Sequence, residues 1–236
     1  MSKKIALVTG ANRGLGLEVS RQLGKQGITI LLGSRTLAAA EVAAKGLQEE
    51  GLDVIGVQLD VTNEEHITAI FDYVDKAYGH LDILINNAGV LLEKSVNEKD
   101  AFRKTIEANT IAPYILTETL LPLLLKSDAG RIVNQSSIIG SLEVMSTNER
   151  VQGFAVPGYA ASKAALNMLT VYWANQLKDT SVKVNSVHPG LVKTDMGGAN
   201  ADLSIVDGAR SAVRLATIPA DGPNGGFFHL DKTLPW

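Results

Sequence analysis

The chain of 236 residues contains no cysteine and no long hydrophobic run. The lack of cysteine excludes disulfide bonds, thiolate catalysis and cysteine-ligated metals. It also agrees with a reducing compartment, and we expect a cytoplasmic protein. Because no stretch approaches the roughly 18 consecutive apolar residues that span a bilayer, we expect no membrane partner.

An excess of charge of one sign is also missing. The 22 Lys and Arg residues and the 25 Asp and Glu residues leave a formal net charge of -3. No basic tract or block of like charge is present, so nucleic acid is an unsuitable partner. The four histidines are scattered without the spacing of metal ligands, and we therefore propose no metal site.

Short apolar runs alternate with longer amphipathic segments along the chain. Most of the runs are continuous, as is typical of strands buried on both faces of a parallel sheet. The predicted strands are 5–8, 28–32, 54–59, 83–85, 131–133, 182–187 and 227–230, and the predicted helices are 14–26, 36–50, 63–78, 98–126, 157–178 and 204–217. The alternation predicts an α/β chain that forms a single Rossmann-type doubly wound domain over residues 1–236. We expect a mostly parallel seven-stranded sheet with helices on both faces.

A glycine-rich turn, TGANRGLG at 9–16, follows the first predicted strand. Gly10, Gly14 and Gly16 would let the chain turn tightly and approach a pyrophosphate without Cβ clashes. The helix that follows offers free N–H groups and the positive end of its dipole. The turn therefore predicts a dinucleotide site, and a turn required only by the topology is the alternative.

Two arginines bear on the choice of dinucleotide. Arg35 follows the second predicted strand, where an NAD-selective site carries an acidic residue for the ribose 2′-hydroxyl, and Arg13 lies in the glycine-rich turn. Two guanidinium groups could bracket a 2′-phosphate through bidentate contacts. We expect NADP(H), and two solvated surface charges are the alternative.

Tyr159 and Lys163 lie four residues apart, on one face of the predicted helix 157–178. An ammonium beside the phenol oxygen favours the phenolate, and an oxidised nicotinamide ring adds positive charge. Lowering the phenol pKa from about 10 by about three units requires about 4 kcal/mol. We expect such a lowered pKa for Tyr159, and a surface tyrosine and lysine are the alternative.

Further polar segments follow the later predicted strands. Residues 86–89 (NNAG) come after the fourth strand, Ser136 and Ser137 after the fifth, and residues 189–194 after the sixth. All of these positions fall at the carboxyl ends of strands, the edge where open α/β sheets bind ligands. Their common location predicts one active site at this edge.

These motifs together resemble the short-chain dehydrogenase/reductase family, and the resemblance covers nearly the whole chain in the right order. The basic pair and the segment after the sixth strand resemble its carbonyl reductase-like, NADP(H)-preferring branch. The residues that carry the resemblance are TGANRGLG (9–16), NNAG (86–89), Asn109, Ser137, YAASK (159–163) and HPGLVKTDM (188–196).

The resemblance implies a role for each catalytic residue. Tyr159 would be the general acid in reduction and the base in oxidation. Lys163 would lower its pKa and bind the nicotinamide ribose. Ser137, rather than Ser136, would hydrogen-bond the substrate oxygen, and Asn109 would hold a water that links Lys163 to solvent.

The resemblance also implies the cofactor contacts. Asp60 and Val61 would contact the adenine, and Val192 and Thr194 the carboxamide. The full expected set is Gly10, Asn12, Arg13, Gly14, Leu15, Gly16, Arg35, Asp60, Val61, Asn87, Ala88, Gly89, Tyr159, Lys163, Pro189, Gly190, Val192 and Thr194.

The segment 138–157 is longer than the family's usual spacing between the catalytic serine and tyrosine. We interpret it as a long loop that forms a flap on the substrate side, with surface elaboration as the alternative. The helices at 98–126 and 157–178 offer a face for a homodimer, which this insertion would either leave free or block.

Together, these features predict an enzyme that transfers a hydride between NADPH and the carbonyl of an aldehyde or ketone. The expected partner is therefore a small carbonyl or alcohol substrate. An NADP(H)-dependent dehydrogenase of a secondary alcohol, of steroid or sugar type, is one alternative. A module that senses NADP(H) without catalysis is another. The latter has no need of Asn109, Ser137, Tyr159 and Lys163, whose presence argues against it.

Overall fold

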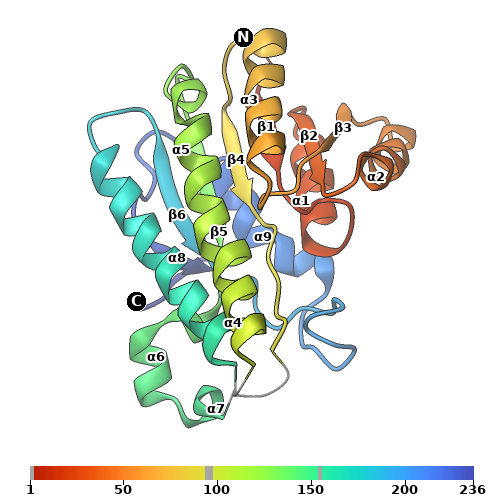
Figure 1. The fold of residues 1–236 in the computed structure, drawn as a ribbon. Helices are drawn as coiled ribbons and strands as arrows, with labels where there is room; N and C mark the ends of the chain where they lie inside the picture. The colour runs from red at the N-terminus through yellow and green to blue at the C-terminus, as the bar shows by residue number, and fades with distance from the viewer. Residues whose placement is uncertain (1–2, 94–97, 154–155) are drawn as a thin grey trace.

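Seven strands of the sheet run parallel, and their carboxyl ends meet at one edge (Figure 1). The computed structural model describes residues 3–93, 98–153 and 156–236. The strand order β3-β2-β1-β4-β5-β6-β7-β8 reverses direction between β1 and β4, which confirms the doubly wound α/β fold. The parallel strands are β1 (Ile5–Val8), β2 (Thr29–Ser34), β3 (Val54–Gln58), β4 (Ile83–Asn86), β5 (Arg131–Gln135), β6 (Lys183–Val187) and β7 (Phe227–His229).

In the ranges that the structure describes, the sheet has eight strands, one more than the seven that the sequence predicts. A strand of two residues, β8 (Lys232–Thr233), pairs antiparallel with β7. The chain reverses through Leu230, whose φ of 51° places it in the left-handed region. So short a strand carries no hydrophobic period, and it therefore could not be predicted from the sequence.

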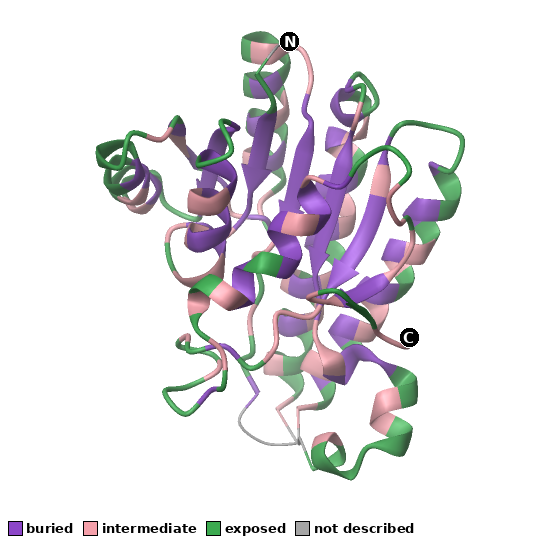
Figure 2. Ribbon diagram, turned by 180° about the vertical axis from the view of Figure 1, so that it is seen from behind, coloured by how far each residue is buried: buried purple, intermediate pink, exposed green. Residues whose placement is uncertain are grey.

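Helices cover both faces of the sheet (Figure 1). Because neighbouring strand residues point to opposite faces, Val8 joins the core under one set of helices and Leu7 joins the core under the other. Figure 2 shows the resulting pattern, in which the strands are buried and the outer faces of the helices are exposed. One set is α1 (Gly14–Gly24), α2 (Leu37–Glu49) and α9 (Ile205–Ala216), and the other is α3 (Glu64–Tyr78), α5 (Ala112–Leu124) and α8 (Pro157–Gln176).

The predicted helix at 98–126 is interrupted. It consists of α4 (Lys99–Ile106), a π-helical turn (Glu107–Ile111) and α5. The turn contains Asn109, whose side chain is fully buried. Single π-helical turns of this kind are frequent at functional sites, and the hydrophobic period of the sequence does not reveal them.

The predicted long loop at 138–157 is also wrong in part. It contains a 3₁₀ turn (Ile138–Gly140) and two short helices, α6 (Leu142–Thr147) and α7 (Glu149–Gln152). Each helix has its own N-cap, since Ser141 accepts the Val144 N–H and Asn148 accepts the Arg150 N–H. Both helices lie at the carboxyl edge of the sheet (Figure 1). Residues 154–155 of this segment lie outside the described residues.

In the part of the chain that the structure describes, no helix combines the length and apolarity required to cross a membrane.

Gly56 tests the close packing of β3 on α2. A Cβ at this position would lie 2.7 Å from the carbonyl carbon and oxygen of Ala40, which are backbone atoms. We expect Gly56→Ala to lower the free energy of unfolding by about 1–3 kcal/mol. The matched control is Gly46→Ala in α2, where no atom lies within 4 Å of the new Cβ. It should stabilise the chain by about 0.5–1 kcal/mol. Urea unfolding measures both, and an unchanged stability of Gly56→Ala would contradict the packing.

Candidate active site

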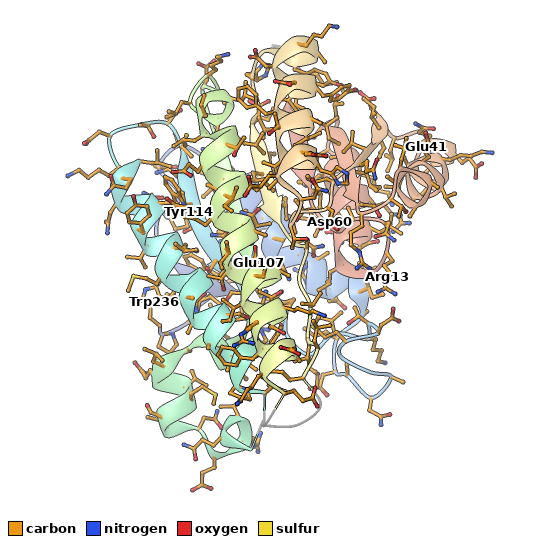
Figure 3. All side chains as sticks on the ribbon, viewed as in Figure 1. Arg13, Glu41, Asp60, Glu107, Tyr114 and Trp236 are labelled. Atoms are coloured by element: carbon orange, nitrogen blue, oxygen red, sulfur yellow. The ribbon has the colours of Figure 1, made fainter. Side chains whose placement is uncertain are left out.

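The predicted site residues gather at the carboxyl edge of the sheet, because the strands that precede them are parallel. Figure 3 shows Arg13 and Asp60 on the β1–β3 half of the molecule and Trp236 on the opposite side. The predicted residues Asn12, Leu15, Ala88 and Pro189 are partly buried at the same edge.

The glycine-rich turn packs closely against the NNAG segment. Gly10 and Gly14 have φ values of 60° and 57°. A Cβ on Gly10 would lie 2.9 Å from Ala88 Cα, and one on Gly16 would lie 2.5 Å from Asn87 Nδ2. Asn87 Nδ2 in turn donates to the carbonyls of Thr9 and Gly10. Glycine is therefore required here by packing, and the same lack of side chains leaves room for a ligand.

The start of α1 fits the phosphates of a dinucleotide. Arg13 occupies the N-cap position with extended backbone, and its side chain makes no capping hydrogen bond. No acidic side chain lies in the first turn of the helix. The first N–H groups and the positive end of the helix dipole are thus left for an anion.

Arg13 and Arg35 are both exposed at this edge. Arg13 Nη1 lies 2.6 Å from Asp195 Oδ2, in the loop that follows β6. That loop also approaches the glycine-rich turn, since a Cβ on Gly14 would lie 3.8 Å from Thr194 Cγ2. An exposed ion pair contributes at most about 1 kcal/mol, so Asp195 holds Arg13 only weakly. This pair joins residues 182 positions apart and was not predicted from the sequence.

The predicted convergence of Ser137, Tyr159 and Lys163 is present in the structure. The Ser137 side chain, just after β5, lies close enough to the Tyr159 side chain from the first turn of α8 to lower the pKa of the phenol. Lys163 Nζ lies 5.5 Å from the centroid of the Tyr159 ring and donates to the Gln135 carbonyl at 2.7 Å. Ser136 is buried and donates to the Lys163 carbonyl instead.

Burial is the largest influence on the pKa values of Tyr159 and Lys163. It raises the pKa of Tyr159 to about 12, against a smaller lowering by the hydrogen bond with Ser137. It lowers the pKa of Lys163 to about 8. The predicted lowering of the Tyr159 pKa is therefore wrong for the chain alone. Its physical reason is that the ammonium lies over the ring and bonds to Gln135, while the phenol is desolvated.

Asn109 joins the loop after β4 to α8. Its Oδ1 accepts the Val90 N–H, and its Nδ2 donates to the Val90 carbonyl and to Ser162 Oγ. A Cβ on Gly89 would lie 3.2 Å from Asn109 Oδ1 and 3.4 Å from Lys163 Nζ. The Asn109 side chain thus holds protein groups at the site, and its predicted water remains a prediction.

His188 holds the backbone beyond Ser137, a role that the sequence did not indicate. Ile138 N–H donates to His188 Nδ1 at 3.2 Å, and the ring of His229 lies 5.2 Å away. Burial, followed by the charge of His229, lowers the pKa of His188 to about 3. The ring is therefore neutral near pH 7 and accepts the Ile138 N–H through Nδ1.

The remaining predicted cofactor residues have mainly local partners. Asp60 Oδ1 accepts both the N–H and the hydroxyl of Thr62, while Val61 is buried in the core. Gly190 has a φ of 86°, and Val192 is buried. Their contacts with a cofactor remain predictions.

Comparison with known proteins identifies the family. The family model for short chain dehydrogenases matches residues 4–203. The chain belongs to the short-chain dehydrogenase/reductase family. It is an oxidoreductase that acts on carbonyl or alcohol substrates with a nicotinamide dinucleotide. The predicted family is thereby confirmed.

Curated relatives of this short-chain dehydrogenase match it over almost their whole length. Carbonyl reductase (NADPH) 1 of Mus musculus is 31% identical, with 100% of this chain and 99% of the relative covered. Short-chain dehydrogenase/reductase 1 of Saponaria officinalis is 33% identical, with 99% and 96% covered. Among solved structures, NADPH-bound carbonyl reductase from chicken fatty liver has a TM-score of 0.84 at 28% identity and covers 100% of both chains.

Lys163→Met tests how much the buried ammonium destabilises the folded chain. Because burial lowers the pKa of Lys163 to about 8, the unfolded chain binds this proton more tightly, and protonation favours unfolding. We expect the variant to be more stable at pH 7 by about 1–3 kcal/mol, after the lost bond to Gln135 is deducted. The gain should shrink as the pH rises from 8 towards 10.5, the ordinary pKa of lysine.

Urea unfolding at pH 7 and at about pH 9.5 measures this effect. The control is Lys126→Met, which removes an exposed ammonium 3.0 Å from Asp75. Its stability should change by less than about 1 kcal/mol at either pH. A Lys163→Met variant less stable than the parent chain at pH 7 would show that the ammonium stabilises the fold.

Proposed function

We propose that the chain reduces the carbonyl of an aldehyde or ketone with NADPH, and that Tyr159 donates the proton. The observation that supports this most directly is that the Ser137 and Tyr159 side chains interact beside the buried ammonium of Lys163. Two hydroxyl groups from separate elements face one another where a substrate oxygen can accept from both. This is the donor arrangement that stabilises a developing alkoxide.

The side chains of the site divide the work of reduction. When bound, the nicotinamide supplies the hydride to the carbonyl carbon. Ser137 hydrogen-bonds the carbonyl oxygen and orients the substrate. Tyr159 keeps its proton at neutral pH, because burial raises its pKa to about 12, and releases it as negative charge develops on the oxygen. The ammonium of Lys163 then stabilises the phenolate that remains.

Lys163 is also suited to return the proton to Tyr159. Burial lowers its pKa to about 8, so that it exchanges a proton near neutral pH. Asn109 would hold a water on the path from Lys163 to solvent, as the resemblance implies.

We propose NADP(H) as the cofactor because of the charge at the two loops beside the adenosine end. Arg13 and Arg35 are exposed and no acidic residue follows β2 directly. A 2′-phosphate carries two negative charges and would displace Asp195 from Arg13, since that exposed ion pair is weak. The names of two relatives, carbonyl reductase (NADPH) 1 and an NADPH-bound carbonyl reductase, agree with this choice.

Tyr159→Phe tests the proposed proton donor. We expect kcat for carbonyl reduction to fall by about 10²–10⁴-fold, because the phenol hydroxyl is lost and the ring is kept. The Kd for NADPH, measured by its fluorescence, should stay within about threefold. The control is Tyr114→Phe, which removes the same group where it donates to Glu118 and should leave kcat unchanged. A Tyr159→Phe variant with the parent kcat would refute the assignment.

Arg35→Ala tests the choice of cofactor. We expect kcat/KM for NADPH to fall about 10-fold or more and the value for NADH to change little, because only NADPH carries the 2′-phosphate. The control is Arg210→Ala in α9, an exposed arginine 3.9 Å from Asp207, which should change neither value. An equal loss with both cofactors, or an initial preference for NADH, would contradict the proposal.

A further inference from the structure

Helix α8 carries Tyr159 but has no N-cap of its own. Val156 occupies the N-cap position and has an apolar side chain, so it forms no capping hydrogen bond. Pro157 is the first helical residue and has no N–H. The first N–H groups of the helix that need partners are therefore those of Gly158 and Tyr159.

Glu93, in the loop after β4, supplies both partners. Its Oε1 accepts the Gly158 N–H and its Oε2 accepts the Tyr159 N–H, each at 2.7 Å. The Glu93 side chain is buried, with 7% of the residue exposed. Both bonds are charge-assisted, and the carboxylate lies at the positive end of the helix dipole.

Gly158 makes room for this carboxylate. A Cβ on Gly158 would lie 2.9 Å from each carboxylate oxygen of Glu93 and 2.9 Å from Phe102 Cδ2 in α4. Any side chain at 158 would force Glu93 or Phe102 to move. The glycine thus has a specific packing reason in the first turn, a place where helix propensity favours other residues.

The backbone carbonyl of Tyr159 is also held by a hydrogen bond. Ser162 Oγ donates to the Tyr159 carbonyl at 2.7 Å and accepts from Asn109 Nδ2 at 3.1 Å. Asn109 bonds in turn to both backbone groups of Val90. The loop 90–93 therefore holds Tyr159 twice, through Asn109 and Ser162 at the carbonyl and through Glu93 at the N–H.

We propose that Glu93 is a positioning residue for the reaction, because it fixes the backbone of Tyr159 and thereby the place of the phenol beside Ser137. This inference rests on the proposed function of Tyr159. Among the described residues, the hydrogen-bond partners of the Glu93 carboxylate are backbone N–H groups, so it acts through Tyr159. A displacement of about 1 Å of a reacting group is enough to slow a reaction by about 10²-fold.

Glu93→Gln is the direct test, since the amide keeps the size of the side chain. Its single oxygen can accept one of the two N–H groups, and its NH₂ faces the other. We expect kcat for carbonyl reduction to fall about 10-fold or more, with KM and the Kd for NADPH within about threefold. The solvent deuterium isotope effect on kcat should exceed that of the parent chain, because proton delivery becomes slower.

Gly158→Ala tests the same geometry by a second route. It keeps the carboxylate but displaces it, and we expect kcat to fall as in Glu93→Gln. Helix propensity alone predicts a more stable α8 and unchanged kcat for this variant.

Asn63→Ala is the matched control for the loss of a cap. Asn63 Oδ1 accepts the N–H groups of Glu65 and His66 at the start of α3, so this variant also removes two capping bonds. Its Tm should fall, while kcat at saturating NADPH stays that of the parent chain. A Glu93→Gln variant that behaves in the same way, with a lower Tm and an unchanged kcat, would overturn the inference.

Three further outcomes distinguish a failure of this inference from a failure of the proposed function. If Glu93→Gln gives no soluble protein, Glu93→Asp decides: a kcat at least threefold lower with unchanged KM supports positioning, and the parent kcat overturns it. If Tyr159→Phe abolishes turnover while Glu93→Gln and Gly158→Ala keep the parent kcat, this inference fails and the proposed function stands. If Tyr159→Phe keeps the parent kcat, the proposed function fails and this inference fails with it.

Discussion

The site depends on one buried ammonium group, that of Lys163, beside the ring of Tyr159. A charge in this place destabilises the fold, and burial lowers the pKa of the group to about 8. A hydrogen bond from the Lys163 ammonium to the Gln135 carbonyl, at the end of β5, offsets part of this cost. The same burial raises the pKa of Tyr159, so the phenol holds its proton until negative charge develops on the substrate oxygen.

The elements around Lys163 keep this environment in place. Gly140 and Gly89 let neighbouring segments approach the lysine, because a Cβ on either would meet it at 2.7 Å or 3.4 Å. Asn109 and Glu93 connect the loop after β4 to the helix that carries Lys163. Backbone contacts and side-chain caps therefore set the geometry of the site.

The sequence predicted the fold and the edge where the site lies, because buried parallel strands give continuous apolar runs and their carboxyl ends must meet. It also predicted that Ser137, Tyr159 and Lys163 converge. It missed β8 and the π-helical turn at Asn109, since neither has a hydrophobic period. It missed Glu93 and Asp195, whose partners lie far away in the chain. The direction of the Tyr159 pKa was wrong, because spacing along a helix shows a neighbouring charge and does not show burial.

The pKa of the Tyr159 phenol tests the account most directly. It can be followed by NMR of ¹³Cζ-labelled tyrosine, assigned with Tyr159→Phe, with and without NADP⁺. The account predicts a phenol that stays protonated to about pH 12 in the chain alone and ionises at lower pH once the positive nicotinamide ring is bound. A phenol that ionises near pH 10 in both states would contradict it.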